Sequence, residues 1–426
     1  QDGAVWSAAF QPTGRRADRY EAVFTEPRVE FRRRDGDFDT HTEIVVSPED
    51  DIELRRVRVT NRSRARRELE VTSYAEVVLA PAIADALHPA FSNLFVQTEI
   101  VPARQAILCA RRPRSSPERT PWMLHLVAVH GAATSGVSFE TDRLRFIGRG
   151  NSAADPAALR DGGTLSGTQG PVLDPIVAIR HRIALDPEQT VTLDLVTGIG
   201  ESREAALGLV EKYQDRSLAD RVIELAWTHS QVVLRQINVT EADAQLYGRM
   251  ASAIVHASAS LRAEAAIISS NRRGQPGLWG HAISGDLPIV LLQIREASNI
   301  ELVRQVVQAH AYWRLKGLAV DLVIWNEDRG GYRQVLHDLI MGLIAAGVEA
   351  NVIDRPGGIF VRPAEQISNE DRILLQAVAR VIVSDEQGSL VREVSVGGGP
   401  GDRGHLRRGF DRRRFAVGDE RARRDD

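Results

Sequence analysis

Residues 278–290, LWGHAISGDLPIV, concentrate the side chains best suited to chemistry in this sequence. Within eight positions, beside two glycines, stand four polar or aromatic residues: Trp279, His281, Ser284 and Asp286. Glycine lets the backbone approach a ligand closely, an indole offers a flat apolar face, and a carboxylate can accept hydrogen bonds from two hydroxyls. That combination suits a sugar. We therefore predict that these four residues bind substrate.

A purely structural interpretation explains the same stretch. Asp286 stands just before Leu287 and Pro288, and an acidic residue before a proline is typical of a helix N-terminus. In that interpretation the loop is buried and Asp286 caps a helix that begins at Leu287. Both interpretations remain open on spacing alone.

The stretch resembles the loop that opens the catalytic domain in glycoside phosphorylases related to cellobiose phosphorylase. It is most similar to the phosphorylase-like C-terminal part of cyclic β-1,2-glucan synthases. In that family an Asp seven residues after a Trp binds the sugar on the non-reducing side of the bond that is cut, so the resemblance implies this role for Asp286. Several cellobiose-type members have Arg directly after the Trp, whereas this chain has Gly280, which is consistent with a different linkage.

The chain before this loop is rich in strand-like segments. From Trp6 to about Thr197, short stretches alternate apolar and polar residues between turn signals, as half-buried antiparallel strands do. The segments that fit are 42–46, 53–60, 69–74, 94–101, 122–129 and 191–197. We predict that residues 1–197 form a large β-sandwich. Asp50 and Asp51 are interpreted as part of a turn rather than as a metal site.

Five longer strings in this half also resemble a known domain. They read SYAEVVLAP (73–81), ADALHPAFSNLFVQTE (84–99), ARRPRS (110–115), FETDRLRFIGRGN (139–151) and VLDPIVAIR (172–180). All five look like the sandwich domain of cyclic β-1,2-glucan synthases and occur in the same order. The resemblance implies an antiparallel supersandwich of the galactose-mutarotase type. His88 is expected to matter chiefly at the junction between this sandwich and the next domain.

Helical patterns follow the sandwich. Residues 198–275 are predicted to form a helical linker. The resemblance implies that residues 276–390 are the N-terminal part of an (α/α)6 barrel. Within that range, 300–315 and 332–346 read as amphipathic helices on either side of an apolar strand, 319–325.

The segment WNED at 325–328 resembles the one that carries the general acid in related phosphorylases. Its surroundings, AVDLVIWNEDRGGY, instead fit an earlier segment of the family, so neither Glu327 nor Asp328 is predicted to be catalytic. The mechanism implied for full-length relatives is inverting phosphorolysis, in which an acid protonates the glycosidic oxygen while phosphate attacks the anomeric carbon from the opposite face. Phosphate would be their co-substrate. We predict no catalytic residue, metal or cofactor in this chain.

Composition points to an ordinary soluble globular protein, with 43% hydrophobic residues, 26% charged residues and a net charge of -3. Nearly all basic residues are Arg, and we expect no binding to nucleic acid. The single cysteine, Cys109, excludes an intramolecular disulfide and agrees with a cytoplasmic location. Neither a signal peptide nor a run of ~18 apolar residues is found. A parent protein in the bacterial inner membrane would carry its anchor elsewhere.

Residues 391–426 are dense in Gly, Arg and Asp and offer no apolar face, so we expect a disordered tail that departs from the family. Two functions fit the sequence. The chain is either a fragment of a cyclic β-1,2-glucan synthase or phosphorylase, or a non-catalytic carbohydrate-binding or scaffolding module. In both cases the expected partners are β-glucan oligosaccharides or polysaccharides and other domains of a larger membrane-bound synthase.

Overall fold

The computed structural model describes residues 3–113, 115, 120–160, 162–327, 335–347, 350–387 and 390. The chain divides into two compact units, Gln1–Val232 and Val233–Asp426. Each has buried hydrophobic clusters of its own. The predicted tail at 391–426 lies outside the described residues.

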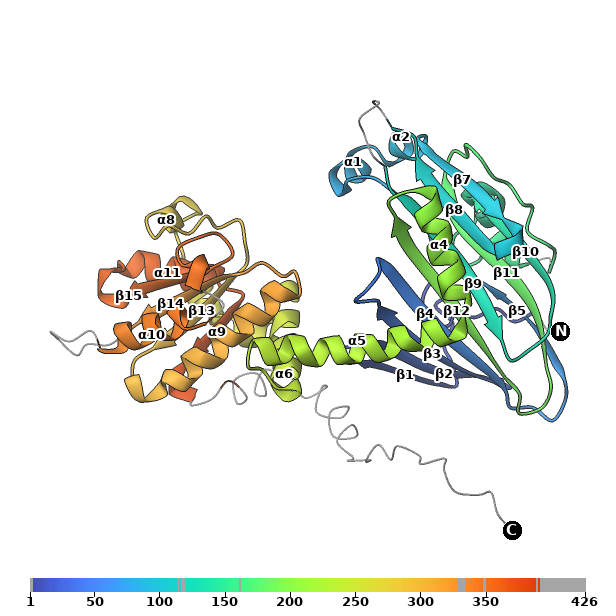
Figure 1. Cartoon of the computed structure of the whole chain (residues 1–426). Helices are drawn as coiled ribbons and strands as arrows, with labels where there is room; N and C mark the ends of the chain where they lie inside the picture. The colour runs from blue at the N-terminus through green and yellow to red at the C-terminus, as the bar shows by residue number, and fades with distance from the viewer. Residues whose placement is uncertain are drawn as a thin grey trace, which may run out of the picture. The chain divides into compact units, whose positions relative to one another are not determined.

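The first unit is built on an eight-stranded antiparallel sheet in the order β1-β2-β3-β4-β12-β9-β8-β7 (Figure 1). Its strands are β1 (Arg19–Phe24), β2 (Val29–Asp35), β3 (Phe38–Val46), β4 (Ile52–Asn61), β7 (Val96–Val101), β8 (Ala106–Arg111), β9 (Trp122–His130) and β12 (Thr190–Gly200). A second antiparallel sheet contains β10 (Thr134–Asp142), β11 (Pro175–Leu185), β5 (Arg67–Thr72) and β6 (Ala75–Glu76).

Alternation along the strands sends side chains into two different cores. Val57 and Val59 of β4 face the second sheet and pack in one cluster with Ile179. On the opposite face, Leu54 packs in another cluster with Tyr213, which belongs to α4 (Arg203–Gln214). The same cluster includes residues of α5 (Arg216–Gln236). The antiparallel β-sandwich followed by a helical region is therefore confirmed. Short helices α1 (Ala82–Leu87), α2 (Pro89–Asn93) and α3 (Arg143–Ile147) lie in the connections.

The second unit contains a four-stranded parallel sheet in the order β15-β14-β13-β16. The strands are β13 (Ile289–Ile294), β14 (Asp321–Asn326), β15 (Ile359–Pro363) and β16 (Val381–Ser384). Its helices are α6 (Glu241–His256), α7 (Ala265–Ser270), α8 (Pro276–Trp279), α9 (Ile300–Leu315), α10 (Val335–Ala345) and α11 (Asn369–Val378).

Helices cover both faces of this sheet (Figure 1). On one face, Leu292 and Ile324 share a cluster with residues of α6, α9 and α10. On the other, Leu291 and Val323 pack with Leu374 of α11. The chain thus winds from β13 through β14 to β15 and then returns past β13 to β16, which is a doubly wound α/β arrangement.

This architecture corrects one prediction and removes one alternative interpretation. Residues 276–390 are predicted as the first part of an (α/α)6 barrel, but their described residues contain a parallel sheet with crossover helices instead. Asp286 is not a helix cap, because the strand β13 follows Pro288. The physical reason is that β13 is buried on both faces, so an unbroken apolar run forms a strand there. The expected helices and apolar strand within this range are present as α9, α10 and β14.

No helix among the described residues is both long and apolar enough to cross a membrane.

Candidate functional site

Short helix α8 and the loop that follows it are fixed to the second unit by two buried apolar side chains, one in each. Leu278 and Ile283 pack in the cluster that covers one face of the parallel sheet. Gly277 allows this approach, since a Cβ there would lie 2.7 Å from the Leu374 side chain. Gly285 has a φ of +78°, which a residue with a side chain rarely adopts. The residues between the anchors and after them are therefore held at the surface.

Three of the four predicted binding residues come together on this loop. The indole of Trp279 is 61% exposed, and its Nε1–H donates to the carbonyl of Ser284 at 3.3 Å. The amide of Asp286 donates to Ser284 Oγ at 3.2 Å. Gln275 donates to the Ser284 carbonyl at 2.8 Å and to Asp286 Oδ1 at 3.0 Å. These residues, Gln275, Trp279, Ser284 and Asp286, are called the indole–carboxylate surface below.

Gln275 is the member of this surface that the sequence analysis misses. An amide side chain just before a short helix carries no distinctive signal, and its two hydrogen bonds depend on how the loop turns back. The bonds orient the Ser284 carbonyl and the Asp286 carboxylate without using the indole face.

His281, the fourth predicted residue, makes contacts of a different kind. Its Nε2 lies 3.4 Å from Asp371 Oδ2, and its carbonyl accepts two hydrogen bonds from Arg362, at 2.7 and 3.1 Å. Burial acts to raise the pKa of Asp371, but hydrogen bonds from Ser368, Arg273 and His281 outweigh it and hold that pKa below its usual range. His281 therefore ties the loop to the N-terminal end of α11.

The carboxyl edge of the parallel sheet holds the residues of the WNED segment. Glu327 forms an ion pair with Arg295 at 2.7 Å. Asp385 accepts hydrogen bonds from the backbone amides of Arg295 and Glu296, at 2.9 and 3.1 Å. Asp328 lies outside the described residues. Ligands of open parallel sheets usually bind at this edge, but here Arg295 pairs with Glu327 and Asp385 is bonded to backbone amides.

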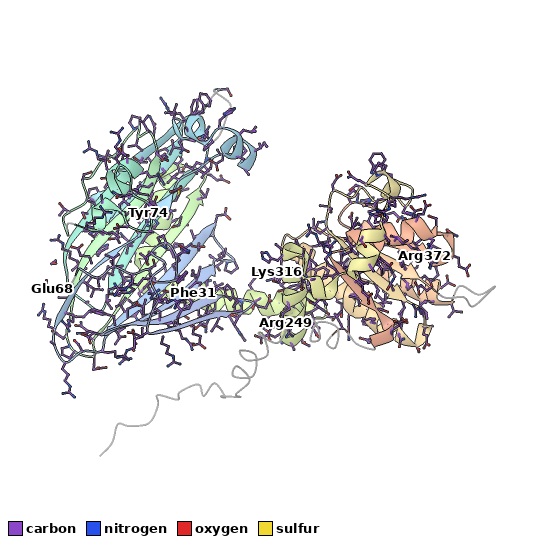
Figure 2. All side chains as sticks on the ribbon, turned by 180° about the vertical axis from the view of Figure 1, so that it is seen from behind. Phe31, Glu68, Tyr74, Arg249, Lys316 and Arg372 are labelled. Carbon is purple, nitrogen blue, oxygen red and sulfur yellow. The ribbon has the colours of Figure 1, made fainter. Side chains whose placement is uncertain are left out.

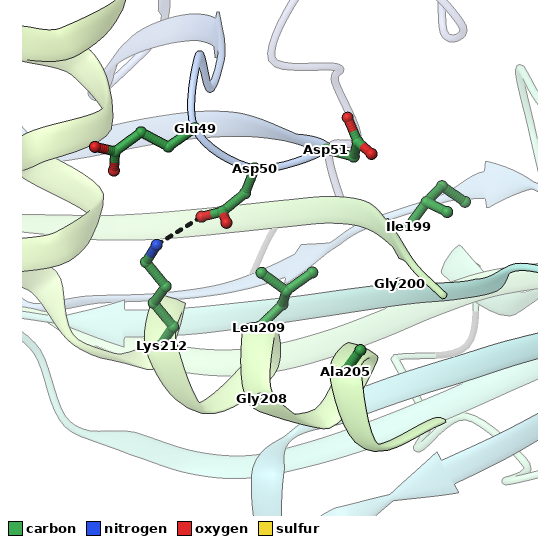
Figure 3. A pocket seen from close by; sticks show the side chains of 9 residues that line it. All are labelled: Glu49, Asp50, Asp51, Ile199, Gly200, Ala205, Gly208, Leu209 and Lys212. Carbon is green, nitrogen blue, oxygen red and sulfur yellow. Dashed lines mark hydrogen bonds and ion pairs between the residues drawn. The ribbon is translucent and has the colours of Figure 1, made fainter. Parts of the chain in front are cut away.

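The first unit has a pocket of about 390 Å³ between the β3–β4 turn and α4 (Figure 3). Asp50 lies in that turn and accepts hydrogen bonds from Lys212, at 2.7 Å, and from the Tyr213 hydroxyl. Burial acts to raise the pKa of Asp50, yet these two bonds lower it overall. Asp50 thus joins the turn to the helix.

A set of potential metal ligands stands on the large sheet: Glu30, His41 and Glu43, with donor atoms within 4.8 Å of one another. Arginines already surround both carboxylates. Arg28 lies 2.7 Å from Glu30 and 3.2 Å from Glu43, and Arg58 lies 2.5 Å from Glu43. These guanidinium groups already pair with both carboxylates, so the described contacts form an ion-pair network.

Comparisons with known proteins agree with this architecture in the first unit. Residues 1–216 match the family described as glycosyl hydrolase 94, supersandwich domain. The cyclic beta-(1,2)-glucan synthase NdvB of Rhizobium meliloti (strain 1021) is 34% identical over 334 residues, which cover 78% of this chain and 12% of that protein. Solabiose phosphorylase of Paenibacillus borealis is 23% identical over 212 residues, or 50% of this chain and 26% of that protein.

The chain therefore spans well under half the length of both relatives. Among solved structures, a bacterial glucoamylase complexed with acarbose aligns with a TM-score of 0.30 and 9% identity, over 50% of this chain and 29% of that one. Half of the sequence matches the supersandwich family, and the structure of that half is an antiparallel sandwich. The chain belongs to the glycosyl hydrolase 94 supersandwich domain family.

Proposed function

We propose that this chain is a segment of a larger enzyme acting on β-1,2-glucan, and that the segment itself binds the glucan at the indole–carboxylate surface. The similarity to a protein named cyclic beta-(1,2)-glucan synthase supports the substrate class. That similarity covers 78% of the chain, so it extends beyond the sandwich unit into the unit that carries this surface.

The observation that carries the proposal is an exposed indole held in place beside a carboxylate. The apolar face of a pyranose ring can stack on an aromatic ring while the sugar hydroxyls bond to neighbouring polar groups. Trp279 already donates its Nε1–H to Ser284, so the ring orientation costs less conformational entropy on binding. Asp286 retains an oxygen beyond the one that Gln275 bonds.

The proposed role is binding rather than bond cleavage. Inverting phosphorolysis needs an acid on one side of the bond and a held phosphate on the other. The indole–carboxylate surface has one carboxylate, Asp286, and no basic side chain. In this proposal the catalytic groups and the phosphate site belong to other parts of the larger enzyme.

Calorimetric titration of β-1,2-glucooligosaccharides into the chain tests this role. A carboxylate bonded to sugar hydroxyls contributes on the order of 2 to 3 kcal/mol, so Asp286→Asn should weaken affinity roughly 30- to 150-fold. Trp279→Ala should also weaken it, because the stacking face is removed. A matched control is Trp227→Ala, which removes an indole of similar exposure, 59%, from α5.

Melting curves recorded for each variant show whether the fold is kept. Loss of affinity in Trp279→Ala and Asp286→Asn, with the Trp227→Ala control unchanged, is the expected pattern. If both variants bound glucan as tightly as the unaltered chain, the indole–carboxylate surface would not be the binding site.

The same proposal predicts that the chain alone does not release glucose 1-phosphate from β-1,2-glucan in the presence of phosphate. The measurement is an enzymatic assay of glucose 1-phosphate against a preparation from cells that lack the gene. Phosphate-dependent release above that background would show that the chain carries an acid and a phosphate site of its own.

A further inference from the structure

Gln275 directs both hydrogens of its side-chain amide into the indole–carboxylate surface. Its Nε2 donates to the Ser284 carbonyl at 2.8 Å and to Asp286 Oδ1 at 3.0 Å. The Ser284 carbonyl also accepts from Trp279 Nε1 at 3.3 Å, so both of its lone pairs are engaged. One amide group therefore connects the backbone acceptor that holds the indole to the carboxylate beside it.

These two bonds also fix which way the amide faces. Rotating it by half a turn would place Oε1 against the Ser284 carbonyl and the Asp286 carboxylate, two groups that only accept. Oε1 therefore points away from both groups, and no described residue donates a hydrogen bond to it. Because Gln275 is exposed, this oxygen can accept a hydrogen bond from a ligand.

Gly285 makes room for the Gln275 side chain. A Cβ at this glycine would lie 2.9 Å from Gln275 Cγ and 3.4 Å from Gln275 Nε2. Gln275 caps the N-terminus of α8, and Trp279 is its last residue. This helix packs against α11, on which Figure 2 labels Arg372. The amide and the indole are therefore carried by one helix that is anchored in the second unit.

The surface consequently offers a ligand more acceptors than donors. Neither Asp286 Oδ2 nor Gln275 Oε1 accepts a hydrogen bond from the described residues. Ser284 Oγ accepts from the Asp286 amide at 3.2 Å and keeps its one hydrogen to donate. Free sugar hydroxyls can donate to both open acceptors. An ether or an anionic substituent would instead leave them facing another acceptor, which costs affinity.

We propose that Gln275 is a specificity-determining residue of the indole–carboxylate surface. It fixes Asp286 beside the indole and supplies Oε1 as a second acceptor, so the surface selects glucans whose hydroxyls are unsubstituted. This inference rests on the proposed function, because it concerns the same glucan site.

Calorimetric titration of a β-1,2-glucooligosaccharide into Gln275→Ala tests the role of the amide. This variant loses one acceptor and leaves the Asp286 side chain to be ordered by the ligand, so affinity should fall roughly 5- to 100-fold. Gln308→Ala is the matched control. It removes an amide that donates to the Asn238 carbonyl at 3.1 Å in the same unit, and it should bind as tightly as the unaltered chain.

Gln275→Glu separates positioning of the carboxylate from a role in loop stability. Two neighbouring carboxyl groups share one proton at low pH and repel each other once both are charged. Affinity relative to the unaltered chain should therefore fall between about pH 5 and pH 8. Taking this ratio at each pH removes the contributions of groups that both proteins share, such as His281, Asp371 and Asp321. A role in stability alone would change the melting curve and leave the ratio flat.

An O-methylated β-1,2-glucooligosaccharide tests the selectivity itself. Its methyl ethers have lost the hydroxyl hydrogens, so the unaltered chain should bind it at least about tenfold more weakly than the free oligosaccharide. The difference should narrow in Gln275→Ala, because one of the two acceptors that read the hydroxyls is gone.

The outcomes distinguish this inference from the proposed function. Weakened binding by Asp286→Asn and Trp279→Ala, with Gln275→Ala unchanged, would overturn the inference and leave the glucan site in place. A flat affinity ratio for Gln275→Glu, or equal affinity for the methylated oligosaccharide, would also overturn it. Unchanged binding by all three variants, or no binding by the unaltered chain, would overturn the proposed function and this inference together.

Discussion

Asp321 is a carboxyl group buried inside the second unit, at the start of β14. Its residue is 0% exposed, and its Oδ1 accepts a hydrogen bond from the amide of Gly357 at 2.7 Å. Its Oδ2 has no hydrogen-bond partner among the described residues. Burial raises the pKa of Asp321, and the negative charge of Asp286 adds to that effect. The folded state therefore favours the protonated form more than the unfolded state does.

This shift predicts how the second unit responds to pH. Because the folded pKa lies above the unfolded value, the native state binds more protons between the two values, and stability falls as pH rises through that window. Asp321→Asn keeps an oxygen for the Gly357 amide and carries no charge. The variant should therefore be more stable than the unaltered chain above the folded pKa, with a flatter profile.

Urea unfolding of both proteins, followed from about pH 4 to pH 8, measures the difference. An Asn variant whose stability depends on pH in the same way as that of the unaltered chain would contradict a raised pKa at Asp321.

Among the elements, α8 and the loop after it hold an exposed indole in place through two buried side chains. Leu278 is 2% exposed and Ile283 is 0% exposed, whereas Trp279 between them is 61% exposed. Removing an anchor loses apolar contacts and leaves a cavity. Removing the exposed indole loses little packing, because one face of the ring already meets water.

Leu278→Ala should therefore lower the free energy of unfolding of the second unit by about 2 to 5 kcal/mol. Trp279→Ala should change it by no more than about 0.5 kcal/mol. Chemical denaturation monitored by circular dichroism compares the two variants. Equal destabilisation by both would mean that the indole packs against the unit and is not available for a sugar.

For the whole molecule, the main consequence of the fold is that two units have separate cores. Leu124 belongs to a cluster of the first unit, and Ile324 belongs to a cluster of the second. Domains with their own hydrophobic cores can unfold independently.

Calorimetry should accordingly resolve two unfolding transitions. Leu124→Ala should lower the midpoint of one transition and Ile324→Ala that of the other, because each substitution lowers the free energy of unfolding of its unit by roughly 2 to 5 kcal/mol. A single transition that both substitutions shift equally would show that the two cores unfold cooperatively.

The sequence by itself determined the sandwich and the family. Alternation in strands such as β4 marks which residues face each core, because one face of the strand packs on the second sheet and the other on helices. The five strings at 73–180 identify the same domain that the family match covers. The positions of α9 and α10 also followed from local periodicity, and that of β14 followed from its apolar run.

Only the tertiary structure decided the parallel sheet and the contacts of the loop. β13 is buried on both faces, so it shows no alternation, and an apolar run of that length fits a helix or a strand equally well. His281 contacts Asp371 and Arg362, which lie more than 80 residues away in the chain, and so differs from the other three predicted residues. Such contacts arise because the fold brings Arg362 of β15 and Asp371 of α11 beside the loop, which no local pattern records.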